Sequence, residues 1–166
     1  MDHGQDEKPA MTSGYRHLLV CIDLSAATAE VLSRSRALAS PGKCRVSVLH
    51  VVDHRPPPDL DYGLGTLPGL EMDLETALDD ARSRLDARLT DPDTDPAERR
   101  VVAGIPHLEI TRLAEELGVD LIVLGSSTRT GLGRLLGSTA HSVLNHAPCD
   151  VLAVRVCARE TRADDT

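Results

Sequence analysis

The fold is decided by residues 119–139, which read VDLIVLGSSTRTGLGRLLGST. Residues 121–124 form a short apolar run with the length of a strand that is buried on both faces. Glycine, serine and threonine follow, and after residues 137–139 apolar residues recur at helical spacing. This order of strand, glycine-rich loop and helix N-terminus suits an anion, because backbone N–H groups of the loop and of the first helical turn converge on one point. A plain turn with a serine N-cap produces the same pattern, and the stretch alone does not choose between the two.

The composition indicates one globular domain with little capacity for nucleic acid. The 166 residues are 41% hydrophobic and 27% charged, which is ordinary for a single domain. The chain has no Trp or Phe and two Tyr, so its core is aliphatic and it lacks aromatic platforms for stacking on bases. The formal net charge of −8 opposes binding to a phosphate backbone. We therefore expect no nucleic-acid partner, although one small phosphorylated ligand held by local dipoles is compatible with this charge.

The two ends of the chain differ in character from its middle. Residues 1–14 and 158–166 are polar, and we expect flexible tails on either side of a single domain at 15–157. No apolar run has the length of a membrane span, and the N-terminus lacks the apolar core of a signal peptide. The four cysteines form no CxxC pair and no zinc-finger spacing, and Cys21 and Cys149 are expected to be small core residues. We expect a cytoplasmic protein with reduced thiols and no membrane partner.

Strand and helix patterns alternate along the domain. Strands are predicted at 17–22, 46–52, 99–103, 121–124 and 151–156, and helices at 26–39, 74–89, 106–117 and from 138 to just before Pro148. Such alternation predicts an α/β fold with an open, doubly wound parallel sheet and helices on both faces. Ligands of such sheets bind beyond the carboxyl ends of the strands, where the winding reverses. Asp23 and Gly125 end the first and fourth strands, which are therefore predicted to be neighbours.

Three further local features yield expectations. Ser25 is the expected N-cap of the first helix, and Gly118 suits the position just past the third. Residues 55–71 form a long connection rich in proline and glycine. Long loops of this kind are often functional, so we expect a mobile segment over the ligand edge, with Tyr62 exposed or facing the ligand. An uninvolved loop fits the same composition.

Two groups of histidines could suggest metal sites, but we interpret them otherwise. His50, Asp53 and His54 straddle a strand end without a fixed geometry, so solvated side chains with a local hydrogen bond at His50 are expected. His141 and His146 are five residues apart on one helix and do not share a face. We predict no metal site.

Five segments taken together resemble the universal stress protein family. They are 18–25 (LLVCIDLS), 47–53 (SVLHVVD), 104–107 (GIPH), 137–140 (GSTA) and 146–154 (HAPCDVLAV). In combination and order they are specific, and they cover about residues 15–157. The resemblance implies a Rossmann-like five-stranded parallel sheet of order 3-2-1-4-5. It also implies a homodimer that pairs through the C-terminal strand around 151–156 and, in many members, a bound adenine nucleotide.

The resemblance also implies the residues of a nucleotide site. Asp23 would hydrogen-bond the ribose, the backbone around Val51 would meet the adenine, and the segments that hold Gly125 and Gly137 would surround the phosphates. The candidate binding residues are Asp23, Val51, Leu124, Gly125, Ser127, Thr128, Gly137, Ser138 and Thr139.

The phosphate loop departs from the family pattern at one position and in its length. Nucleotide-binding members usually show Gly, two residues, Gly, nine residues, Gly, then Ser or Thr. Here Thr128 stands at the second glycine, and eight residues separate it from Gly137. Because Thr128 is β-branched and resists positive φ, the loop has one flexible donor position fewer.

Three functions are compatible with the sequence. The first is a stress-response protein that acts as a regulatory homodimer and binds AMP, ADP or ATP, with or without Mg²⁺. The second is a dimer of the same type that binds no nucleotide and works through contacts with an unidentified client protein. The third, a weak ATPase or phosphotransfer enzyme, has the least support, because neither the loop nor the strand ends offer a lysine for a γ-phosphate or an obvious base. We predict no catalytic residues and at most very weak ATP hydrolysis.

Overall fold

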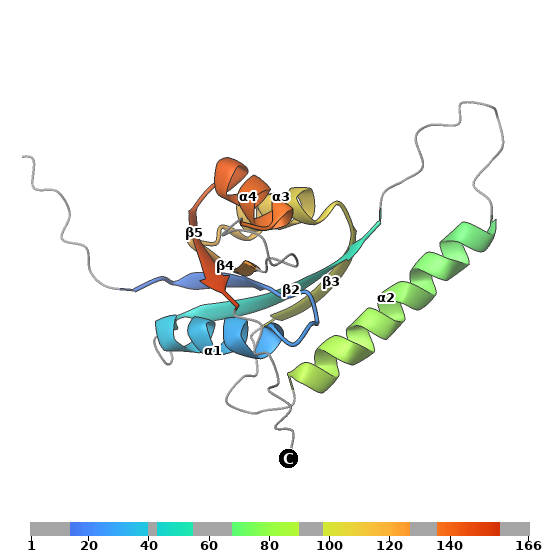
Figure 1. Cartoon of the computed structure of the whole chain (residues 1–166), viewed down its shortest axis with the longest axis horizontal. Coiled ribbons are helices and arrows are strands. Elements are labelled where there is room, and N and C mark those ends of the chain that lie inside the picture. Colours follow the sequence, from blue (N-terminus) through green and yellow to red (C-terminus); the bar gives the residue numbers. More distant parts are fainter. Residues whose placement is uncertain (1–13, 40–42, 55–67, 90–97, 127–135, 157–166) are drawn as a thin grey trace, which may run out of the picture.

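A computed structural model of the chain describes residues 14–39, 43–54, 68–89, 98–126 and 136–156. Strands and helices alternate within these residues, as predicted (Figure 1). Most of both expected tails, residues 55–67 with Tyr62, and Ser127 and Thr128 lie outside the described residues. In chain order the elements are β1 (His17–Cys21), α1 (Thr28–Leu38), β2 (Arg45–Asp53), α2 (Pro68–Arg88), β3 (Glu98–Gly104), α3 (Pro106–Leu117), β4 (Leu121–Ser126), α4 (Ser138–His146) and β5 (Asp150–Arg155).

The five strands form one parallel sheet of order β3-β2-β1-β4-β5. The predicted order is confirmed, and so is the expectation that the first and fourth strands are neighbours. Cys21, the last residue of β1, lies opposite Leu49 of β2 on one side and Leu124 of β4 on the other. The winding therefore reverses between β1 and β4.

Two apolar layers enclose the sheet, and β1 contributes to both. Leu18 and Val20 pack in a cluster with residues of α1 and α2. Leu19 and Cys21 pack in a second cluster with residues of α3 and α4. In Figure 1, α1 lies below the sheet, and α3 and α4 lie above it. All five residues of β1 are buried, which explains why its sequence is a continuous apolar run rather than an alternating one.

Helix boundaries differ from the predictions in two places. α1 begins at Thr28, with Ala27 as its N-cap, because Ser25 closes a separate turn: its Oγ accepts a hydrogen bond from the Ala27 N–H at 3.1 Å. α2 begins at Pro68 rather than at 74, since proline is favoured in the first helical turn, where its missing N–H costs nothing. Gly118 adopts a left-handed conformation (φ 59°) just past α3, as expected.

Polar contacts fix the amino ends of the strands, opposite the carboxyl edge. The carboxylate of Asp120 accepts hydrogen bonds from the backbone N–H groups of Arg16 at 2.9 Å and His17 at 2.8 Å. Burial alone would raise the pKa of Asp120, but these two donors outweigh it and hold the pKa below its usual range. The buried imidazole of His17 lies 2.9 Å, through Nε2, from Oγ of the buried Ser47 on β2. These contacts connect β1, β2 and the start of β4.

We predict that His17 makes the stability of the protein depend on pH. Burial, assisted by the Arg45 guanidinium, lowers the pKa of the folded imidazole. The unfolded chain therefore binds more protons than the folded one below the unfolded value of about 6.5, and this stability is lost as the pH falls through the folded pKa. In urea titrations between about pH 7 and about pH 5, the free energy of unfolding should fall less steeply in His17→Gln than in the wild type. His141→Gln, on the exposed side of α4, is the control, and equal slopes in all three proteins would contradict the prediction.

Candidate functional site

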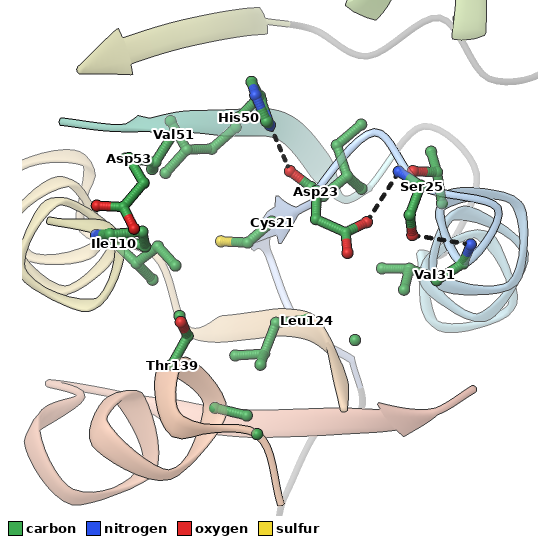
Figure 2. Close-up of a pocket in the computed structure, with 18 of the residues that line it drawn as sticks. Cys21, Asp23, Ser25, Val31, His50, Val51, Asp53, Ile110, Leu124 and Thr139 are labelled. Carbon is green, nitrogen blue, oxygen red and sulfur yellow. Dashed lines mark hydrogen bonds between the residues drawn. The ribbon is translucent and has the colours of Figure 1, made fainter. Parts of the chain in front are cut away.

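A cavity of about 620 Å³ lies at the carboxyl edge of the sheet, where the winding reverses. Its walls are the ends of β1, β2 and β4 together with the first turns of α1, α3 and α4 (Figure 2). Small-molecule sites usually enclose roughly 300–1,000 Å³. The cavity therefore has the size and the position expected of a ligand site in a doubly wound sheet.

Seven of the nine predicted site residues line this one cavity. Ser127 and Thr128, the other two, lie outside the described residues. The seven come from β1, β2, β4 and α4 and the segments that follow or precede them, so the fold brings together residues that are far apart in sequence. They are Asp23, Val51, Leu124, Gly125, Gly137, Ser138 and Thr139.

Asp23 lies on the rim of the cavity, held by a turn that follows β1. Its Oδ1 accepts a hydrogen bond from the Ser25 backbone N–H at 3.0 Å (Figure 2). Leu24, between them, has a φ of 58°, and an L-residue in this left-handed conformation costs roughly 1 kcal/mol. The turn directs the chain away from β2, and Asp23 remains exposed with its second carboxylate oxygen toward open space.

The N-terminus of α4 presents uncapped N–H groups to the same cavity. Gly137 is the N-cap residue, and no side-chain cap bond is found at this end among the described residues. Ser138 therefore lies in the first turn and not at the N-cap position that the alternative interpretation gave it. The first bond within the helix runs from the His141 N–H to the Gly137 carbonyl at 2.9 Å, which leaves the preceding N–H groups of the turn open. Together with the helix dipole they favour a negatively charged group at this end of the cavity. Thr139 points into it (Figure 2).

The two glycines of this site, Gly125 and Gly137, do not adopt unusual dihedral angles. Among the described residues, glycines with positive φ are Gly14, Gly104 and Gly118, so neither Gly125 nor Gly137 requires a left-handed backbone. A Cβ on Gly125 would lie 3.4 Å from a methyl group of Val31 on α1. This distance is an ordinary van der Waals contact, so a small side chain fits at position 125.

Residues that line the cavity and were not among the predicted site residues include Cys21, His50, Asp53 and Ile110. Cys21 is buried as predicted, and burial raises the pKa of its thiol, but its sulfur also faces the cavity (Figure 2). Ile110 could have been found from the helical spacing that places it one turn after Pro106, at the start of α3. His50 donates a hydrogen bond from Nδ1 to the Ile22 carbonyl at 2.8 Å, so its expected local bond is confirmed.

The described part of the chain offers neither a cluster of metal ligands nor a membrane-spanning helix. No three His, Cys, Asp or Glu side chains gather there in a way that could hold a metal ion. None of its helices combines the length and the apolar character that crossing a bilayer demands.

The fold and the cavity together define the class of the protein. A parallel sheet of order 3-2-1-4-5, with a cavity where its winding reverses, is a doubly wound, Rossmann-like α/β domain. Within this class the chain belongs to the universal stress protein family, whose sequence pattern matches residues 14–155. The resemblance recognised from the five sequence segments is thereby confirmed.

Similar proteins cover nearly the whole domain. Universal stress protein A homolog 1 of Coxiella burnetii (strain RSA 493 / Nine Mile phase I) is 35% identical over 141 residues, which span 84% of this chain and 96% of the relative. The solved structure of the protein MJ0577 matches with a TM-score of 0.66 at 28% identity and covers 86% of this chain and 97% of its own. A universal stress protein solved in complex with cAMP matches with a TM-score of 0.54 at 25% identity, over 86% of this chain and 98% of its own.

We predict that Gly125 tolerates alanine but not a large side chain. The added Cβ would meet Val31 at 3.4 Å and Val156 at 3.8 Å, which are ordinary van der Waals contacts. Gly125→Ala should therefore change the free energy of unfolding by less than about 1 kcal/mol. Gly125→Leu overfills the space under α1 and should cost about 1–3 kcal/mol. Urea denaturation measures both, and equal destabilisation by the two substitutions would contradict the packing argument.

Proposed function

We propose that this protein is a cytoplasmic regulator of the stress response that binds an adenine nucleotide and acts as a homodimer on an unidentified client protein. The nucleotide is AMP, ADP or ATP, with or without Mg²⁺, and residues 15–157 form the functional domain. The observation that carries the proposal is the cavity at the switch point, where an exposed carboxylate at Asp23 and the uncapped N-terminus of α4 line opposite walls. A relative solved in complex with cAMP supports a ligand of the same chemical class.

The groups around the cavity fit a nucleotide in one orientation. The open N–H groups and the Thr139 hydroxyl at α4 attract phosphate, whereas the Asp23 carboxylate repels it and suits ribose hydroxyl groups. The ribose would therefore lie at Asp23, the base at Val51, and the phosphates against α4. The proposed binding residues are the nine predicted ones.

The cavity lining is unsuited to catalysis of phosphoryl transfer. Among the described residues that line it there is no lysine or arginine, so the second and third phosphates of a nucleotide lack a cationic partner there. The histidine in the lining, His50, uses Nδ1 for the Ile22 carbonyl. We therefore propose a binding protein without enzymatic activity beyond very weak ATP hydrolysis.

A dimer that binds no nucleotide is the second candidate function. It is favoured by one observation, the threonine at position 128 where nucleotide-binding members usually have glycine. In that case the protein would act through contacts with its client alone.

We predict that AMP or ADP binds at least as tightly as ATP. The α-phosphate lies nearest the helix N-terminus, whereas the γ-phosphate depends on the loop that has one flexible donor position fewer. Each missing charge-assisted hydrogen bond costs roughly 1.5–3 kcal/mol, about tenfold or more in affinity. Isothermal titration calorimetry with the three nucleotides tests the order, and Thr128→Gly should shift it toward ATP.

Controls for this titration separate the two candidate functions. Asp23→Ala should weaken binding of all three nucleotides, and Gly125→Ala reports on crowding of the cavity without loss of the fold. Much tighter binding of ATP than of AMP would contradict the predicted order. No binding of any nucleotide, together with no nucleotide released from freshly purified protein in mass spectrometry, would favour the second candidate function.

The proposed dimer uses β5, which is one of the two edge strands of the sheet. The opposite edge, β3, carries Glu98, Arg99 and Arg100 at its start, and such charges oppose pairing with another strand. β5 instead reads DVLAVR, with four consecutive apolar residues, and an edge of this kind is usually paired or covered. A second copy of β5 about a twofold axis would satisfy its outer backbone groups.

We predict a dimer in solution. Multi-angle light scattering at micromolar concentration should give twice the chain mass of 17.8 kDa. Val154, which is 5% exposed, packs in the layer beneath α1, so Val154→Asp should disrupt the fold or the dimer, and far-UV circular dichroism distinguishes the two. A wild-type mass of one chain would contradict the proposed assembly.

A further inference from the structure

The regular backbone hydrogen bonds between β1 and β2 end one bond earlier than the parallel pattern allows. The last residue pair of the two strands is Cys21 with Leu49, and the Ile22 N–H still donates to the Leu49 carbonyl at 2.9 Å. In a parallel pair the groups that face the same neighbour recur every second residue, so the Val51 N–H would be the next donor, to the Ile22 carbonyl. That bond is absent between these described residues. The Ile22 carbonyl accepts from Nδ1 of His50 instead, at 2.8 Å (Figure 2).

We propose that His50 is a positioning residue of this site: by occupying the Ile22 carbonyl, it keeps the backbone N–H and C=O of Val51 unpaired and available to the base of an adenine nucleotide. The inference rests on the proposed nucleotide-binding function and names how the base would be recognised. The role assigned to His50 is to keep the main-chain groups of Val51, where the base is proposed to lie, free of other partners.

The contact requires a proton on Nδ1 of His50 and sets the direction of the imidazole ring. A carbonyl oxygen only accepts, so Nδ1 of His50 carries the proton. Side chains alternate along β2: Val52 packs against the layer under α1 and α2, and Val51 against the layer with α3 and α4. His50 therefore lies on the α1/α2 side of the sheet, while the Val51 side chain lines the cavity.

After β1 the chain turns away from β2 at the same point, and this leaves the Val51 carbonyl without its regular partner on β1. The Leu24 N–H would be the next partner of the Val51 carbonyl in a continued ladder. Leu24 has a φ of 58° and turns away, and no bond between the two groups is found in this described segment. The N–H and C=O of Val51, which point in the same direction in an extended strand, thus form a donor–acceptor pair at the wall of the cavity.

This pair is complementary to one edge of adenine. On that edge N1 accepts a hydrogen bond and the neighbouring N6 amino group donates one. A ligand base that lies in the plane of the sheet would continue the ladder where β1 ends. If His50 did not satisfy the Ile22 carbonyl, the Val51 N–H would be drawn to it, because a half-buried acceptor left unpaired is costly.

The test compares His50→Leu, His50→Asn and the wild type. Asparagine carries a donor close to the place of Nδ1, whereas leucine fills the volume without one. Calorimetry measures AMP against 1-deaza-AMP, in which N1 is replaced by C–H. We expect the wild type and His50→Asn to favour AMP by about threefold to tenfold, the usual effect of one neutral hydrogen bond, and His50→Leu to lose this preference. His141→Leu, on the surface of α4, is the matched control and should retain it.

A second measurement needs no ligand. Amide hydrogen exchange by NMR should show a rapidly exchanging Val51 N–H in the ligand-free wild type and in His50→Asn. The same amide should be protected in His50→Leu, where it pairs with the Ile22 carbonyl. Thermal unfolding of each variant confirms that it is folded before either comparison is made.

The outcomes separate this inference from the function on which it rests. If AMP binds but the preference and the Val51 exchange are the same in all variants, the positioning role is overturned while the proposed function stands. If the wild type binds no nucleotide, the proposed function and the assignment of the base are both overturned. The exchange rates of the Val51 N–H then decide alone whether His50 keeps this group from pairing with the Ile22 carbonyl.

Discussion

The site depends on the enclosure of β1. This strand is hydrogen-bonded to β2 and β4 along its length and covered on both faces, and all five of its residues are buried. A slip of one residue would move its side chains into the opposite apolar layer and leave backbone groups unpaired, so one register is strongly favoured. β1 ends at Cys21, whereas β2 continues to Asp53 and β4 to Ser126. The cavity is therefore the space beyond the end of β1, between its longer neighbours β2 and β4. Its position is fixed because the buried core fixes the register of these three strands.

Some of the polar groups that line this space are backbone groups on rigid elements. The uncapped turn of α4 and the main chain at Val51 are held by a helix and a strand, so they are oriented before any ligand arrives. Binding to such groups requires little reorganisation, which favours affinity. Burial raises the pKa of the Cys21 thiol, which faces the same cavity, and so disfavours its reactive thiolate form.

Much of this arrangement could be predicted from the sequence because its signals are local. The apolar runs predicted the strands, and the residues that end them, Asp23 and Gly125, predicted which strands are neighbours. The start of α2 at Pro68 was missed because Pro-Gly is also typical of a loop. The limit on side-chain size at position 125 could not be predicted, since it is set by Val31, a residue far away in sequence. The hydrogen bond between His50 and Ile22 could not be predicted either, because it depends on the register of β1 and β2 at the point where the two strands separate.

Gly125 also connects the cavity with the proposed dimer edge. It lies opposite Val154 in the β4–β5 register, and its α-carbon faces Val31 and Val156, so one residue borders the cavity, helix α1 and the end of the edge strand. Packed interiors transmit displacement because they have few voids. A ligand that displaced β4 at Gly125 would therefore act directly on Val154 within β5 and on Val156 just after it. The proposed nucleotide site and the proposed dimer edge thus lie on adjoining surfaces of β4 and β5. Such direct contact is a physical condition under which nucleotide binding could change the strength of the dimer.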